Sequence, residues 1–183
     1  MFILYAIPIG VLGGALLGGR IERLASVRFR LAPLAVAALA IQLVLFSPLA
    51  ADLPPDVGRS IYVASTVLVA VVVAANVRLT GVPLVVAGAV CNLAAIVANG
   101  GAMPASASAL GAIGAGVRAH TNSVLADRPA LEPLTDIFAT PAWLPFANVF
   151  SVGDVLIGLG IAVAIAAAMR NRPADQTRSA RSS

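Results

Sequence analysis

Asp154 is the residue best placed to do chemistry, because it is the one acid within reach of a long apolar stretch. Carboxylates inside membranes commonly bind ions or substrates or carry protons. Ser151 lies three positions earlier, however, and the pair matches the capping box that begins a helix. A capping carboxylate would meet free backbone N–H groups and the positive end of the helix dipole. The sequence therefore leaves two roles open for Asp154, a helix cap or a catalytic or binding carboxylate.

Asparagines form the second candidate group. Asn92 and Asn99 are seven positions apart in one apolar stretch, so they would share one face of a helix. Such amides either bond to a neighbouring helix or line a pocket for a polar headgroup. Asn148 lies shortly before Asp154. The candidate ligand-binding residues are therefore Asn92, Asn99, Asn148 and Asp154, and Asp154 is the one candidate for catalysis.

Metal and cofactor chemistry has little support in the sequence. The single histidine, His120, and the acids Asp127, Glu132 and Asp136 occur in one segment, but not at the spacing of helix-borne metal ligands. Cys91 is the only cysteine, which rules out an intrachain disulfide and a cysteine metal cluster. We therefore expect no metal site and no cofactor.

Five long apolar stretches must position these residues. The chain is 60% hydrophobic and 11% charged, far from the averages of about 45–50% and about 25% for soluble domains. Stretches of 17 to 20 residues match a bilayer core of about 30 Å, and helices satisfy their own backbone groups there. We predict an all-α membrane protein, a five-helix transmembrane bundle, with helices at about 2–19, 31–49, 61–77, 82–98 and 152–169.

The arginines orient these helices. Nine of the twelve follow the first, third or fifth stretch, and the exceptions are Arg59, Arg118 and Arg128. Cations are retained on the cytoplasmic side, so we expect the N-terminus outside and the C-terminus in the cytoplasm of a bacterial plasma membrane. The net charge of +4 forms no basic stripe with interleaved aromatic residues, so nucleic acid is not an expected partner.

The same pattern divides the chain into parts. Residues 1–170 form the predicted transmembrane domain, and residues 99–150 form an outer cap inserted between the fourth and fifth helices. The cap contains many prolines and Trp143, which favours short helices or a re-entrant piece near the outer headgroups. Residues 171–183 are rich in Arg and Ser and are expected to form a disordered cytoplasmic tail.

Gly10, Gly14 and Gly18 recur every four residues in the first stretch. Small residues at this spacing allow two helix backbones to approach closely. They would pack either inside the bundle or against another membrane protein or a second copy of this chain. Membrane lipids are the other expected partners.

Three segments resemble a family of small bacterial polytopic membrane proteins known only as a domain of unknown function. They are the Gly-Gly-Arg-Ile-Glu-Arg run at 18–23, the segment 92–104 from Asn92 to Pro104, and the segment 148–158 from Asn148 to Gly158. The resemblance covers most of the chain. It implies a membrane protein and no particular activity.

A partial resemblance to lipoprotein signal peptidases rests on Trp143-Leu-Pro-Phe-Ala-Asn148 followed by Asp154, and on the segment 88–95. It implies hydrolysis at the outer leaflet by two aspartates that share the acid and base roles. Asp154 matches the second aspartate, whereas Ala95 stands at the position of the first. Asp127 or Asp136 would have to supply the missing carboxylate.

We therefore expect a multi-pass membrane protein that is non-enzymatic, either an accessory or scaffold subunit or a binder of a lipid-like molecule. The alternatives are an aspartate-dependent hydrolase of the outer leaflet and a small-solute transporter.

Overall fold

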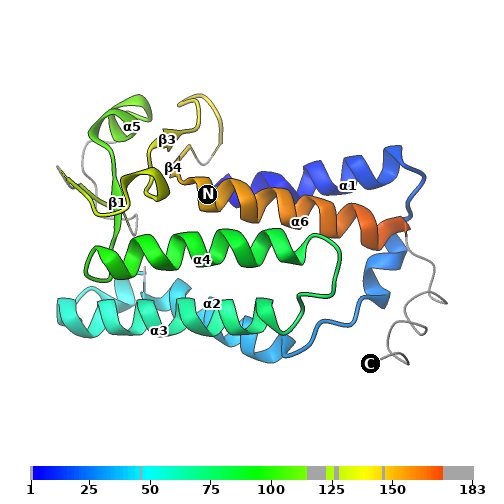
Figure 1. Ribbon diagram of the computed structural model, residues 1–183, viewed down its shortest axis with the longest axis horizontal. Helices are drawn as coiled ribbons and strands as arrows, with labels where there is room; N and C mark the ends of the chain where they lie inside the picture. Colours follow the sequence, from blue (N-terminus) through cyan, green and yellow to red (C-terminus); the bar gives the residue numbers. More distant parts are fainter. Residues whose placement is uncertain (1, 46, 115–122, 126–127, 146, 171–183) are drawn as a thin grey trace.

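A computed structural model describes residues 2–45, 47–114, 123–125, 128–145 and 147–170, and most of them are helical (Figure 1). His120, Asp127 and the predicted tail at 171–183 lie outside the described residues. The long helices are α1 (Ala6–Leu16, after the 3-10 turn η1, Phe2–Tyr5), α2 (Ala32–Leu45), α3 (Pro55–Ala74), α4 (Val82–Ala98) and α6 (Val152–Arg170).

These five helices occur where the sequence predicts apolar stretches, but some boundaries differ. The helix α1 ends at Leu16. Gly18 then adopts a positive φ of 76°, and Gly19 N donates to Gly14 O, as in the glycine motifs that end many helices. The helix α3 begins six residues earlier than predicted, at Pro55. Proline suits the first turn of a helix, and Asp56 beside it meets the positive end of the dipole.

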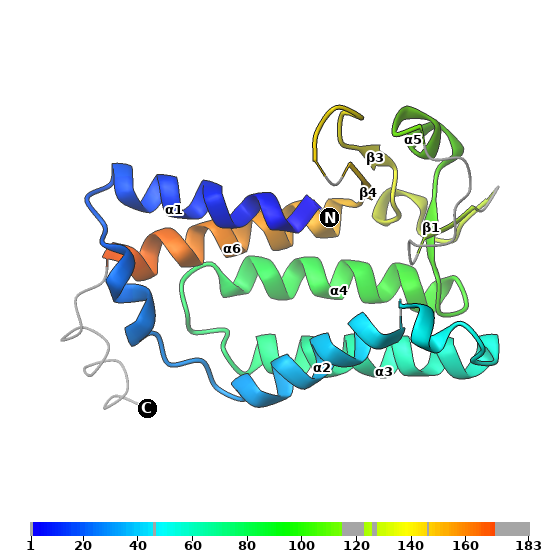
Figure 2. The same cartoon turned by 180° about the vertical axis from the view of Figure 1, so that it is seen from behind.

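The long helices are arranged in a row, and their order in space differs from their order in the chain. The principal contacts run from α1 to α6, then to α4, to α3 and to α2 (Figures 1 and 2). Consecutive helices α1 and α2 are thus separated by three others. Residues 17–31 connect them, including the 3-10 turn η2 (Ile21–Ser26), which contacts the end of α6.

The long helices alternate in direction along the chain, so the molecule has two distinct ends (Figure 1). One end carries the N-terminus, the α2–α3 connection and the segment that follows α4. The other end carries η2, the α3–α4 connection and the end of α6, together with most of the described arginines, which are Arg20, Arg23, Arg28, Arg30, Arg78 and Arg170. We call these the cap end and the arginine end.

Two of the described helices, α3 and α6, have the length and composition of membrane-spanning helices. The segments Ile3–Leu16, Ala32–Leu45 and Val82–Ala98 are shorter apolar helices. By length and composition these two helices are weak evidence of membrane association, and the five-helix transmembrane bundle stays a prediction.

The described residues of the cap form α5 (Ala107–Ala112), the turn η4 (Glu132–Leu134) and four short strands. Strand β1 (Met103–Ala105) pairs in parallel with β2 (Ser123–Leu125), and β3 (Phe138–Ala139) pairs antiparallel with β4 (Val149–Phe150). The sequence predicts short helices or a re-entrant piece here and gives no sign of the strands. Strands of two or three residues are too short to produce a recognisable alternation of apolar and polar residues.

A buried apolar cluster holds the cap and the helices together. Ala95 and Ile96 of α4 form a cluster with Met103 of β1, and Tyr62 and Leu134 pack against it. This cluster joins the end of α4 to the cap and to α3. The strand β4 leads directly into α6, so the cap also fixes where α6 begins.

The first two glycines of the repeat, Gly10 and Gly14, lie on α1 and face α6. A Cβ added at Gly10 would lie 2.9 Å from the Cα of Ala162, and one at Gly14 would lie 3.1 Å from the Cα of Ala166. A Cβ at Gly18 would meet nothing within 4 Å. The repeat therefore serves packing within the chain at its first two positions, and self-association through this face stays a prediction.

Candidate functional site

Ser151 and Asp154 begin α6 as a reciprocal cap. Ser151 Oγ accepts a hydrogen bond of 3.0 Å from the backbone N–H of Asp154, and Asp154 Oδ2 accepts one of 3.2 Å from the N–H of Ser151. Ser151 is fully buried where β4 passes into the helix. This is the capping box that the Ser-x-x-Asp spacing predicts, with aspartate in place of the more usual glutamate.

Asn92 of α4 completes the site from across the helix interface. Its Nδ2 donates to Asp154 Oδ1 at 2.8 Å, and its Oδ1 accepts from Ser151 Oγ at 2.8 Å. Four hydrogen bonds thus join three residues, which we call the Asn92–Ser151–Asp154 cluster. The cluster fastens the middle of α4 to the first turn of α6.

Two glycines make this contact possible. A Cβ on Gly153 would overlap the side-chain oxygen of Asn92, and one on Gly88 would overlap the carbonyl oxygen of Gly153. The backbones of α4 and α6 therefore touch at this point, as small residues permit in apolar helix pairs. A second glycine contact follows along the same interface, where Gly81 faces Gly160.

The polar groups of the cluster are all hydrogen-bonded. Each oxygen of the Asp154 carboxylate accepts a hydrogen bond, and the amide and hydroxyl groups around it bond to one another. Ala95, which stands at the position of the first aspartate of signal peptidases, is completely buried. Within the described residues no group of three or more His, Cys, Asp or Glu side chains is arranged to hold a metal.

Asn99 follows α4 directly as its C-cap residue and has a different partner from Asn92. Its Nδ2 donates to Ala130 O at 2.8 Å, and its Oδ1 accepts from Ala130 N at 2.9 Å. The side-chain amide thus both donates to and accepts from the backbone of one cap residue. Asn92 thus joins α4 to α6, whereas Asn99 joins α4 to the cap, and the two amides do not converge on one pocket.

Asn148 acts through its backbone. Its carbonyl accepts from the N–H of Thr140 at 3.0 Å, and its N–H donates to Thr140 Oγ1 at 2.7 Å. These bonds join the two ends of the segment 140–148. Trp143 lies in this segment, and 81% of its surface is exposed. The hydroxyl of Tyr5 donates to Pro145 O and ties this loop to the start of the chain.

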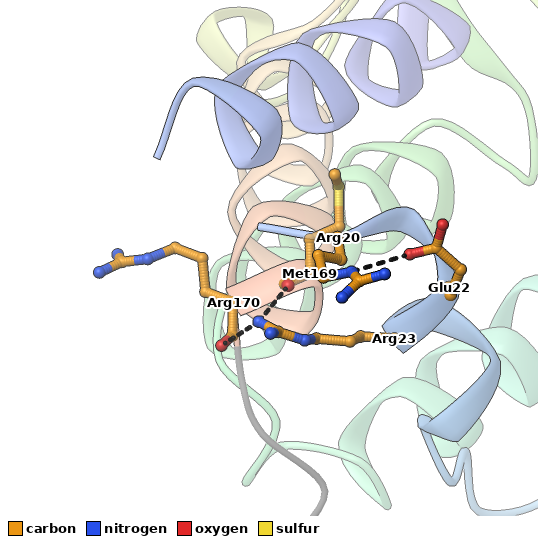
Figure 3. A network of polar contacts seen from close by, with 5 residues as sticks. All are labelled: Arg20, Glu22, Arg23, Met169 and Arg170. Carbon is orange, nitrogen blue, oxygen red and sulfur yellow. Dashed lines mark hydrogen bonds and ion pairs between the residues drawn. The ribbon is translucent and has the colours of Figure 1, made fainter. Parts of the chain in front are cut away.

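A second polar contact, at the arginine end, was not predicted from the sequence (Figure 3). Arg23 Nη1 donates to the carbonyl oxygens of Met169, at 3.2 Å, and of Arg170, at 3.0 Å, while Arg20 N donates to Met169 O at 2.8 Å. These carbonyls end α6 and have no partners within the helix. The guanidinium group therefore caps the C-terminus of α6, where a cation also meets the negative end of the dipole.

Removing this cap should lower stability without changing the fold. We expect Arg23→Gln to reduce the free energy of unfolding by about 1 kcal/mol, measured by titration with a denaturing detergent. The matched control is Arg28→Gln, because Arg28 is exposed and makes no contact of this kind within the described residues. Equal stability of the two variants would contradict a capping role.

Residues 26–166 match a protein family described as a family of unknown function (DUF5317). No curated protein and no solved structure matches this chain.

Proposed function

Because the match spans most of its length, the chain belongs to the DUF5317 family of unknown function, and we propose that it is a non-enzymatic, multi-pass protein of the bacterial plasma membrane. It crosses the bilayer five times and acts as an accessory or scaffold subunit. The observation that carries the proposal is the placement of large apolar side chains. They are exposed along the outer faces of the long helices, for example Leu12, Leu16, Val36, Leu43 and Leu159.

The interior supports the same proposal. The buried apolar side chains of the long helices are few, and several are alanines. Water-soluble domains place their large apolar residues inside, whereas helices in lipid associate through small residues and hydrogen bonds. Gln42 Nε2, for example, donates to Ser65 Oγ at 3.2 Å between α2 and α3. Such a distribution suits hydrocarbon as the surrounding solvent.

The lengths of the helices are compatible with five crossings. Two helices are shorter than the bilayer core of about 30 Å, because the 11 residues of α1 rise about 17 Å and the 14 residues of α2 about 21 Å. The 3-10 turn η1 (Phe2–Tyr5) runs directly into α1 at the cap end, and the turn η3 (Pro48–Ala50) follows α2 there. Local thinning of the bilayer accommodates the remaining mismatch at modest cost.

The non-enzymatic part of the proposal rests on the Asn92–Ser151–Asp154 cluster. A carboxylate that bonds on both oxygens to its own helix and to α4 is placed to hold two helices together. The scaffold role draws support from the open row of helices, because α1 and α2 lie at its two edges and present exposed side chains such as Ile9 and Val36.

The topology can be tested with single cysteines in a Cys91→Ala background. Ala107→Cys in α5 lies at the cap end and Thr80→Cys at the arginine end, and both positions are exposed. We expect a membrane-impermeant maleimide to label Ala107→Cys on intact cells and Thr80→Cys only after lysis. The full chain should also remain in the membrane pellet after alkaline carbonate extraction. The reverse labelling pattern, or release by carbonate, would overturn the proposal.

A further inference from the structure

An apolar groove opens between α2 and α3 at the cap end. Its volume is about 350 Å³, and its lining contains no polar side chain. The lining residues are Ala40, Ile41, Val44 and Leu45 of α2, Ala50 of η3, and Leu53 and Ile61 before and within α3. The volume lies at the lower end of the range of about 300–1,000 Å³ for ligand pockets, which suits a hydrocarbon chain better than a bulky ligand.

Two acidic residues adjoin the lining residues of this groove along the chain. Asp52 lies between the lining residues Ala50 and Leu53, is exposed, and makes no ion pair within the described residues. Asp56 follows in the first turn of α3, and its carboxylate lies 3.6 Å from Arg59 in an exposed pair. The arginine therefore offsets one of the two negative charges, and the Asp52 charge remains.

We propose that this groove binds a phospholipid whose headgroup carries a primary ammonium, as in phosphatidylethanolamine. The acyl chain lies along the apolar lining, and the ammonium donates hydrogen bonds to the Asp52 carboxylate. This rests on the proposed membrane orientation, which places the cap end at the outer headgroups. A quaternary ammonium cannot donate hydrogen bonds, and an anionic glycerol headgroup is repelled by the carboxylates.

Native mass spectrometry of the full chain in mild detergent tests the binding. The protein is incubated with equal amounts of three dioleoyl lipids bearing ethanolamine, choline and glycerol headgroups. We expect one retained lipid for each chain, with ethanolamine preferred over choline by about threefold to fivefold, the range for one exposed ion pair. A wild-type chain that retains no lipid, retains the three equally, or prefers glycerol would overturn the proposal.

Two variants separate the contributions of tail and headgroup. Ala40→Phe places a ring in the groove and should abolish retention of every lipid, whereas Leu49→Phe is its control, because Leu49 is 85% exposed and does not line the groove. Asp52→Asn should keep the bound lipid and lose the preference for ethanolamine. Unchanged retention in Ala40→Phe, or unchanged preference in Asp52→Asn, would contradict the assignment.

Failure of the lipid-binding proposal can be distinguished from failure of the proposed function. Cysteine labelling on intact cells reports the crossings and does not depend on bound lipid. A correct labelling pattern without selective retention removes the groove assignment alone, whereas a wrong labelling pattern removes the orientation on which the groove assignment rests.

Discussion

The Gly88→Val variant is expected to lose about 1–3 kcal/mol of unfolding free energy, because the contact between α4 and α6 has no room for a side chain. A Cβ at Gly88 would lie 2.8 Å from Ile157 Cγ1 and 2.9 Å from Ile157 N, and would overlap the carbonyl oxygen of Gly153. Two of these three neighbours are backbone atoms, so a change of rotamer cannot relieve the overlap. The helices must move apart, and the hydrogen bonds of Asn92 must lengthen.

Titration with a denaturing detergent, followed by circular dichroism, measures the loss. Gly88→Ala should give a smaller effect in the same direction. The matched control is Gly13→Ala in α1, where an added Cβ meets nothing within 4 Å. That control should equal the wild type or gain up to about 1 kcal/mol, because alanine favours the helix over glycine. If Gly88→Ala were as stable as Gly13→Ala, α4 and α6 could not touch at this point.

The second large effect is expected for the Asn92–Ser151–Asp154 cluster. Asn92→Ala removes the donor to Asp154 Oδ1 and the acceptor of Ser151 Oγ, so a partly buried carboxylate is left short of one hydrogen bond. Hydrogen bonds to charged groups contribute about 1.5–3 kcal/mol, and we expect a loss of that size. Asn148→Ala is the control, because Asn148 bonds to Thr140 through its backbone.

A double-mutant cycle with Asp154→Asn distinguishes a helix clamp from a catalytic carboxylate. If the two side chains act on each other, the double variant should be more stable than the sum of the single losses predicts, by about 0.5–3 kcal/mol. A clamp predicts that Asp154→Asn destabilises the protein. Loss of a measurable activity in Asp154→Asn at unchanged stability would instead establish a catalytic aspartate and overturn the non-enzymatic proposal.

Local sequence signals determined several features of this protein. Val82-Pro83 after Gly81 gives the start of α4, and its predicted range 82–98 agrees with the structure. Ser151 and Asp154 specify the first turn of α6, because the capping bonds form between residues three positions apart. The approximate positions of the long helices follow from the apolar stretches in the sequence, and the gathering of most described arginines at one end follows from their places between those stretches.

The partners of these helices were decided only in the tertiary structure. The long helices are apolar on most of their surface, so no polar face indicates which side packs against a neighbour. The sequence therefore could not tell that α6 lies between α1 and α4, or that Gly10 and Gly14 face Ala162 and Ala166.

The same limit applies to the candidate site. The sequence places Asn92 and Asn99 on one face of one helix, whereas α4 ends at Ala98, Asn92 bonds to a residue 62 positions later and Asn99 bonds to the cap. An amide can satisfy its donors and acceptor in many ways, and its spacing along a helix does not select among them. The close approach of the α4 and α6 backbones at Gly88 and Gly153 places Asn92 beside Asp154, and so turns a local helix cap into a clamp between two helices.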